Sequence, residues 1–284
     1  MSKILKLIRT EQWAKNFLIF LVPLAAKNFE ISIYLDLVFV FFGFSFLASS
    51  GYIVNDIFDL ESDRHHYIKK KRVLASGKIS VSSSKIIIFI FFFLGSTILI
   101  AVNNELLLYS YVYLLLSILY SKYLKYIKIL DVSIISIFFV FRTYLGSLSS
   151  GINISIYLLL IVLFSSLAIV IGKKLSILLD NNIHEIGVKK SIKTNYSASF
   201  LSNTLISSFI LTLITYNLWI FKNFDISSYI FIFSNILLII FCKKFYNLTL
   251  QSKTEDFISS LKKNELLLLS FIFFNLFTMF GILF

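Results

Sequence analysis

The stretch IIIFIFFFLGSTILIAV, residues 86–102, decides the fold class, because it carries no charged side chain. A second run, LLLLSFIFFNLFTMFGILF at 266–284, is equally apolar. About 20 such residues in a helix cross the roughly 30 Å core of a bilayer. Membrane strands are shorter and alternate polar with apolar residues. The two runs therefore predict an all-α integral membrane protein.

The rest of the chain agrees with this class. Hydrophobic residues make up 58% of it and charged residues 15%. The one proline, Pro23, predicts mostly unbroken helices with a break in the first. The lone cysteine, Cys242, excludes an intrachain disulfide and a multi-thiolate metal site. No small-residue cleavage site follows the first apolar run, so we expect no removable signal peptide.

Hydropathy divides the chain into nine expected spans, all within a single membrane-embedded domain, residues 1–284. We expect the first span to be short and to break at Pro23. The spans lie at about 14–28, 32–55, 85–102, 106–121, 130–149, 154–172, 196–219, 228–246 and 265–284.

The basic residues predict the orientation of these spans. With the N-terminus in the cytoplasm, the inner segments hold twenty-four of the 27 Lys and Arg residues. Only Lys27 and Lys222 lie outside, and Arg142 lies within a span. This is the positive-inside pattern of plasma-membrane proteins. It explains the net charge of +12 without nucleic acid, and the long polar inner loops place the function at the cytoplasmic face.

An acidic cluster follows the second span. Asp56, Asp59 and Asp63 are spaced i, i+3, i+7, which places them on one face of a continuing helix. Neighbouring carboxylates repel each other unless a cation neutralises them, and carboxylates with phosphate oxygens and water suit Mg²⁺. Asn55 adds a neutral oxygen. The plainer interpretation is a solvated acidic helix end paired with nearby lysines. The basic stretch that follows favours a site for a metal and a phosphate.

This stretch, NDIFDLESD (55–63), resembles the N-D-x-x-D-x-x-x-D motif of the UbiA superfamily of intramembrane prenyltransferases. The resemblance implies nine helices around a central cavity near the cytoplasmic face, and Mg²⁺ as the ion that handles a diphosphate. It implies that Asp56, Asp59 and Asp63 are the catalytic metal ligands.

Further motifs resemble the polyprenyl-phosphate phosphoribosyltransferase branch of that family. Tyr67 and Val73 replace two prolines of the branch, and Ile177 replaces a frequent Glu. The matching residues are Arg9, Gln12, Trp13, Lys15 and Asn16; Asp63, Arg64, His66, Lys69, Arg72, Leu74, Ala75, Ser76 and Gly77; Tyr120, Ser121, Leu124, Lys125, Asp131, Arg142 and Gly146; and Gly172, Lys173 and Lys174.

Several of these residues have more than one interpretation. An arginine inside a span is a functional candidate by default, but Arg142 could also belong to a buried ion pair. It lies about 16 Å from Asp131 along a helix, so the two need separate partners. His66 suits acid–base work, a phosphate contact or a solvated loop. The substrate-binding candidates are Gln12, Lys15, Asn55, Arg64, His66, Lys69, Arg72, Tyr120, Lys125, Arg142, Lys173 and Lys174.

Two enzyme activities compete. An aromatic prenyltransferase of the 4-hydroxybenzoate type, using a polyprenyl diphosphate, usually carries a second D-x-x-x-D between the sixth and seventh spans, and this loop is basic instead. One acidic and several basic sites favour transfer of 5-phosphoribose from phosphoribosyl diphosphate to a polyprenyl phosphate in cell-envelope biosynthesis. A transporter and an inactive scaffold are the other classes, and the oligomeric state stays open, a homo-oligomer included.

Overall fold

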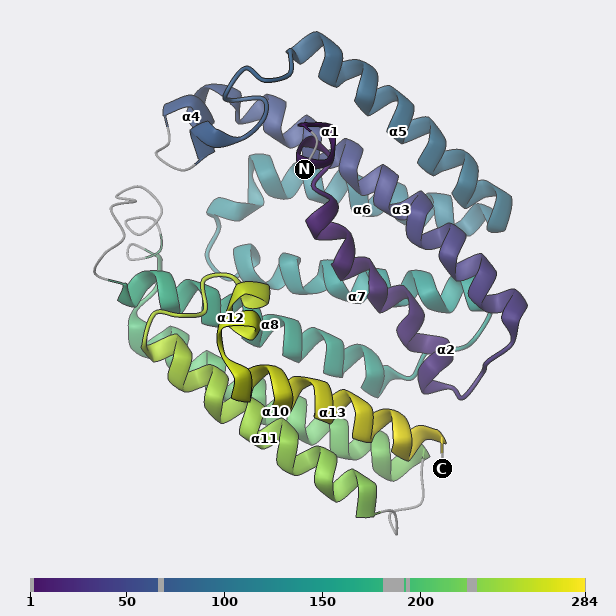
Figure 1. Ribbon diagram of the computed structural model, residues 1–284, viewed down its shortest axis with the longest axis vertical. Coiled ribbons are helices and arrows are strands. Elements are labelled where there is room, and N and C mark those ends of the chain that lie inside the picture. Colours follow the sequence, from purple (N-terminus) through teal and green to yellow (C-terminus); the bar gives the residue numbers. More distant parts are fainter. Residues whose placement is uncertain (1–2, 66–68, 181–191, 193–194, 224–228, 284) are drawn as a thin grey trace. The chain divides into compact units, whose positions relative to one another are not determined.

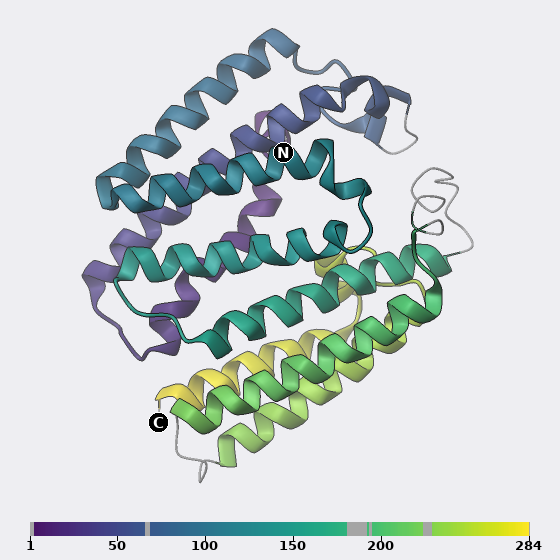
Figure 2. The ribbon, with the colours of Figure 1, turned by 180° about the vertical axis from the view of Figure 1, so that it is seen from behind.

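The structure is a computed structural model, and it describes residues 3–65, 69–180, 192, 195–223 and 229–283. Every regular element among these residues is a helix, as Figures 1 and 2 show from opposite sides. The chain divides into two compact units. Unit 1 comprises residues 1–127 and 141–153, and unit 2 comprises residues 128–140 and 154–284. The helix α7 (Leu130–Ser150) contributes residues to both units.

Unit 1 contains most of the residues predicted for the site. The long helix α3 runs beside α5 in unit 1, and α6 packs against both (Figure 1). Besides its part of α7, the unit contains α1 (Lys3–Leu7), the 3₁₀-helix η1 (Thr10–Phe20), α2 (Leu21–Ala25), α3 (Ile31–Phe58), α4 (Leu60–His65), the 3₁₀ turn η2 (Lys69–Lys71), α5 (Val81–Val102), α6 (Asn104–Lys122) and the 3₁₀ turn η3 (Leu124–Tyr126).

The crossing of α3 and α5 depends on two glycines. A Cβ added at Gly95 would lie 2.6 Å from the carbonyl oxygen of Gly43 and 2.9 Å from the nitrogen of Leu47. Small residues allow two apolar helices to approach closely, which is how helices gain packing energy in lipid. The α5–α6 connection is tight because Asn103 ends the first helix and caps the second, accepting from the Glu105 N–H.

Unit 2 is a bundle of long helices. In it α8 packs against α10, and α11 against α13 (Figure 2). Leu175, Leu201, Leu205 and Phe245 lie in its buried core. Besides its part of α7, the unit contains α8 (Ile156–Leu179), α10 (Ala198–Asn223), α11 (Tyr229–Leu250), α12 (Phe257–Lys263) and α13 (Glu265–Leu283).

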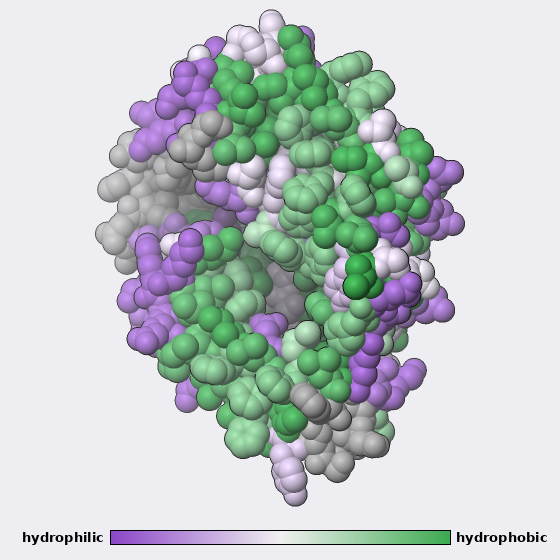
Figure 3. Space-filling model, turned by 45° about the vertical axis from the view of Figure 1, so that its right-hand side comes forward, coloured by the Kyte–Doolittle hydropathy of each residue, from purple (hydrophilic) through white to green (hydrophobic). Residues whose placement is uncertain are grey.

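Seven of the described helices are long and apolar enough to cross a membrane: α3, α5, α7, α8, α10, α11 and α13. Their outward side chains are apolar, with Ile86, Phe89 and Phe93 exposed along α5. Apolar residues also cover much of the face in Figure 3. Exposed apolar surface on this scale would be costly in water. The chain is therefore an integral membrane protein.

The expected first span takes a different form from the long helices. Residues 14–28 fall on η1, α2 and the turn after them, and the 3₁₀-helix covers eleven residues. Pro23 lies within α2, which ends two residues later at Ala25. The change of helix type thus comes before the proline, not at it. The expected span 106–121 falls on α6.

Candidate functional site

The acidic cluster lies at the C-terminal end of α3. This helix ends at Phe58, Asp59 caps it, and α4 begins at Leu60. Helical hydrogen bonds still cross the break, because the Asp59 N–H donates to the Asn55 carbonyl at 2.9 Å and the Asp63 N–H to the Asp59 carbonyl at 2.8 Å. The expected continuous helix is thus interrupted at one residue, Asp59.

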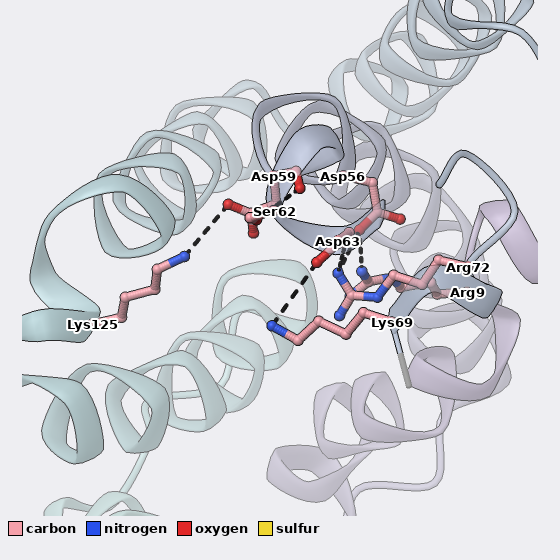
Figure 4. A network of polar contacts seen from close by, with 8 residues as sticks. All are labelled: Arg9, Asp56, Asp59, Ser62, Asp63, Lys69, Arg72 and Lys125. Carbon is pink, nitrogen blue, oxygen red and sulfur yellow. Dashed lines mark hydrogen bonds and ion pairs between the residues drawn. The ribbon is translucent and has the colours of Figure 1, made fainter. Parts of the chain in front are cut away.

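Two of the carboxylates share one arginine. Arg72 Nη1 donates to Asp63 Oδ2 at 2.6 Å and to Asp56 Oδ1 at 3.2 Å (Figure 4). Arg9 also donates to Asp56 Oδ1, and Lys69 Nζ lies 4.0 Å from Asp63 Oδ1. Asp56 and Asp63 are only 6% and 2% exposed, so these cations compensate charge at sites shielded from water.

The third carboxylate points away from this pair. Asp59 faces Lys125 of η3, with Oδ1 3.6 Å from Nζ (Figure 4). The neighbouring Lys122 Nζ lies 3.9 Å from the ring centroid of Phe58, a cation–π contact. The end of α6 and the following turn η3 are thus joined to the end of α3 by two lysines. Lys125, predicted to bind substrate, neutralises Asp59 in this structure.

The residues around the acidic cluster fit a hard cation in their chemistry. The side-chain oxygen of Asn55 is buried and has no hydrogen-bond partner among the described residues. A buried carbonyl oxygen without a donor is a favourable ligand for Mg²⁺, as are the nearby carboxylates. Arg72 now lies between Asp56 and Asp63, and Asp59 is turned to Lys125. Accordingly, the described residues contain no group of three or more His, Cys, Asp or Glu side chains arranged to hold a metal ion.

Arg142 lies deep in unit 1 and is 2% exposed. Its Nε donates to Asn16 Oδ1 at 2.8 Å and its Nη2 to the Tyr113 hydroxyl at 2.7 Å. Its guanidinium carbon also lies 5.1 Å from the ring centroid of Tyr113. These contacts connect α7 to η1 and α6. Asp131 instead accepts from Lys174 and Tyr196, so the prediction of separate partners for Arg142 and Asp131 agrees with the contacts.

A second polar cluster lies in unit 2. Lys174 of α8 and the Tyr196 hydroxyl both donate to Asp131, which is buried at the start of α7. The Tyr196 hydroxyl in turn accepts from the Ile129 N–H at 2.7 Å. Lys174 therefore neutralises a carboxylate of its own unit, whereas Lys173 beside it is exposed. Asp131 is thus paired with a lysine inside its own unit.

The other predicted residues take more scattered positions. Gln12 and Lys15 are half-buried on η1, and Tyr120 is half-buried on α6. Arg64 is exposed on α4. His66, Tyr67 and most of the loop after α8, which includes Lys189, Lys190 and Lys193, lie outside the described residues.

The predicted site residues did not include Arg9, Asn16, Tyr113 and Tyr196, which belong to these clusters. Arg9 and Asn16 could have been predicted, because they lie at the two ends of the RTEQWAKN segment that carries Gln12 and Lys15. Tyr113 and Tyr196 could not, because nothing in the sequence distinguishes them from the rest of the 15 tyrosines.

Fold and site together define an all-helical membrane protein with an acidic cluster, held by arginine and lysine, at the end of a long helix. The model of the UbiA prenyltransferase family matches residues 17–277. The chain belongs to this family, and it is a membrane transferase.

Individual relatives agree with this assignment. A decaprenyl-phosphate phosphoribosyltransferase of Mycobacterium tuberculosis is 28% identical over 227 residues, which is 77% of this chain and 74% of the relative. An uncharacterised protein of Sinorhizobium fredii is 35% identical over 116 residues, covering 40% of this chain. The chain spans only 22% of that longer protein.

Solved structures show the same fold. A structure of a digeranylgeranylglyceryl phosphate synthase aligns with a TM-score of 0.67 at 26% identity, covering 99% of each chain. A UbiA homologue from Archaeoglobus fulgidus, bound to GPP and Mg²⁺, aligns with a TM-score of 0.62 at 18% identity, covering 99% of this chain and 98% of the other.

Proposed function

We propose that this protein transfers a 5-phosphoribosyl group from phosphoribosyl diphosphate to a polyprenyl phosphate and releases diphosphate. The observation that carries the proposal is the match over 77% of the chain to a decaprenyl-phosphate phosphoribosyltransferase. The site is consistent with it, because one acidic cluster is surrounded by arginines and lysines from three separate segments. A reaction among three phosphate-bearing groups needs more cations than a prenyl transfer with one diphosphate.

The bound donor would need its diphosphate neutralised as it leaves. Arg72 and Lys69 both contact the buried carboxylate of Asp63, and Arg64 lies exposed on the adjoining helix. We assign them to the diphosphate oxygens, where fixed positive charge stabilises the developing negative charge. The bond from the anomeric carbon to the diphosphate oxygen breaks, and the leaving group keeps the electron pair. A lipid phosphate oxygen then bonds to the same carbon. That oxygen is already anionic, so the step needs no strong general base.

We assign Asp56, Asp59, Asp63 and Asn55 to a divalent cation. The support is the buried unpartnered oxygen of Asn55 and the Mg²⁺ in the Archaeoglobus fulgidus homologue. When bound, Mg²⁺ would supply charge neutralisation to the diphosphate. The three aspartates would hold the ion together with Asn55, and Arg9 keeps the Asp56 carboxylate in place through its hydrogen bond.

The remaining assignments are proposals of the same kind. Lys125, Lys173 and Lys174 are candidates for the ribose 5-phosphate and the lipid phosphate, with Gln12, Lys15, His66 and Tyr120 as further donors. Both units belong to one transferase domain, since the family match extends over both. Nine spans with a cytoplasmic N-terminus, in a bacterial plasma membrane, would place the site at the inner face. The basic inner loops support this orientation.

The test is incubation of the purified protein with Mg²⁺, a polyprenyl phosphate and phosphoribosyl diphosphate labelled in the ribose. We expect label in the lipid phase and equimolar diphosphate in the aqueous phase. A parallel reaction contains 4-hydroxybenzoate and a polyprenyl diphosphate. Prenylated product in that reaction, without ribose transfer in the first, would overturn the proposal in favour of an aromatic prenyltransferase.

A further inference from the structure

The long 3₁₀-helix η1 is held by contacts that the proposed reaction does not use. A 3₁₀-helix has three residues per turn, so Trp13, Asn16 and Ile19 share one face. Asn16 and Ile19 are buried, and Trp13 is half-buried. Runs of this length are uncommon because 3₁₀ hydrogen bonds are poorer than α-helical ones. The surrounding contacts must therefore favour this conformation.

The first set of contacts is with α3. The Trp13 indole N–H donates to Ser49 Oγ at 3.0 Å, and Asn16 Nδ2 donates to Ser45 Oγ at 2.8 Å. Three residues of 3₁₀-helix rise about 6 Å, and so do four residues of α-helix. The pairs Trp13–Ser49 and Asn16–Ser45 are thus one turn apart on both helices. An α-helical η1 would lose this match, because Trp13 and Asn16 would rise only about 4.5 Å.

The second set of contacts, with α7, repeats the same spacing. Arg142 donates to Asn16, and four residues later Gly146 meets the backbone of Ile19. A Cβ at Gly146 would overlap the Ile19 carbonyl, so only glycine permits this approach. Three residues on η1 again correspond to four on α7. The spacing of Arg142 and Gly146 therefore follows from the 3₁₀ geometry of the helix against which they pack.

The N-terminal end of η1 leads to the acidic cluster. Arg9 precedes the helix with a φ of 53°, in the left-handed region. Its guanidinium donates to Asp56 and lies 5.4 Å from the ring centroid of Tyr52. Ser49, which holds Trp13, also donates to the Ile8 carbonyl at 2.8 Å. A shift of η1 by one residue would move Arg9 by about 2 Å, which is enough to break its bond to Asp56.

We propose that Arg142 and Gly146 are positioning residues that fix the register of η1, so that Arg9 reaches Asp56. The kinetic readouts of this proposal rest on the proposed function, and the proposal reassigns Arg142 from substrate binding to the protein interior. The planar guanidinium suits this role, because it bonds Asn16 and Tyr113 in two directions at once. A lysine has a single ammonium on a flexible stem and would hold only one of the two.

The kinetic test uses Arg142→Met and Gly146→Ala, alone and combined with Arg9→Gln. If these residues act by positioning Arg9, each variant raises the KM for the diphosphate donor about tenfold, which is equivalent to losing one charged hydrogen bond. The KM for the lipid phosphate stays within about twofold of the parent value. In the Arg9→Gln background both effects shrink to within twofold. Arg142→Lys regains part of the loss.

The outcome that overturns the proposal is equally specific. If Arg142 binds the lipid phosphate, Arg142→Met raises the lipid-phosphate KM, its effect is additive with Arg9→Gln, and Gly146→Ala is silent. The glycine variant separates the two roles, because it adds a methyl group against Ile19 without removing any polar group.

A second readout needs no catalysis. The chain has two tryptophans, so Trp219→Phe leaves Trp13 as the reporter on η1. We expect red-shifted emission and stronger acrylamide quenching in both Arg142→Met and Gly146→Ala, at circular dichroism like that of the parent. Unchanged emission overturns the positioning role even if transfer activity is never found. Changed emission without any transfer supports it and refutes the proposed function alone.

Discussion

Replacing Arg72 with Gln tests how the acidic cluster is stabilised. Arg72 makes a 2.6 Å bond to Asp63 and a longer one of 3.2 Å to Asp56. A hydrogen bond to a charged group contributes about 1.5–3 kcal/mol, and breaking a fully buried ion pair costs about 3–5 kcal/mol. Arg9 remains on Asp56, and the Arg72 side chain is 32% exposed. The free energy of unfolding should therefore fall by about 3 kcal/mol, the lower end of the range for a fully buried ion pair.

The assay is thermal unfolding in detergent, with EDTA or with Mg²⁺. A loss of about 3 kcal/mol lowers the Tm by about 6–12 °C for a chain of this size. Mg²⁺ should recover more of the Tm in Arg72→Gln than in the parent, because Arg72 no longer competes for Asp56 and Asp63. A ligand at a hundred times its Kd stabilises by about 2.7 kcal/mol. The matched control is Arg64→Gln, whose exposed side chain should change stability by less than about 0.5 kcal/mol.

Two results would refute this reasoning. In the first, Arg72→Gln melts within about 2 °C of the parent in EDTA, a difference of only about 0.5–1 kcal/mol. Arg72 would then compensate no buried charge. In the second, Mg²⁺ raises the Tm of both proteins equally, so that the ion and Arg72 do not share carboxylates.

Three further outcomes follow from the other contacts. Asp59→Asn should abolish Mg²⁺-dependent transfer, measured as labelled lipid, with insertion and Tm preserved; near-full activity would remove Asp59 from the metal set. Lys174→Met should lower stability by about 1.5–3 kcal/mol, because it leaves the buried Asp131 carboxylate with less compensation, while the exposed Lys173→Met should not; equal Tm values would contradict this. Gly172→Ala should cost about 1–3 kcal/mol by overlap with the Phe245 ring; an unchanged Tm would show that the ring moves aside.

Most of the fold was readable from the sequence because the lipid phase imposes a simple pattern. The expected span 85–102 corresponds to α5, Val81–Val102, and the expected span 130–149 corresponds to α7, Leu130–Ser150. Apolar length alone gives these positions. The 3₁₀ form of η1 was not predicted, because apolar content does not distinguish helix types. Its signal was the three-residue spacing of Trp13, Asn16 and Ile19, and this spacing has meaning only once Ser45 and Ser49 lie beside them.

The sequence predicted which residues form the acidic cluster, but not which cation pairs with which aspartate. The spacing of the aspartates located the cluster at the end of α3. It did not show that Asp59 would face Lys125 while Asp56 and Asp63 share Arg72. Those partners come from distant segments, and the chain topology that brings them together is not a local property. Arg142 illustrates the same point, because its position inside a span predicted importance but not its neutral partners Asn16 and Tyr113.

The charge balance of the cluster bears on the ligand that it would accept. Four cations, Arg9, Lys69, Arg72 and Lys125, contact the three aspartates, which leaves a formal charge of one positive. One divalent cation would raise this to three positive charges around the buried carboxylates of Asp56 and Asp63, where uncompensated charge is costly. A diphosphate ester with two to three negative charges would restore neutrality. On the proposed function, ion and donor should therefore bind with strong positive coupling, and each should bind weakly alone. Titrating Mn²⁺ with and without phosphoribosyl diphosphate measures that coupling, and equal Mn²⁺ affinities in both titrations would contradict it.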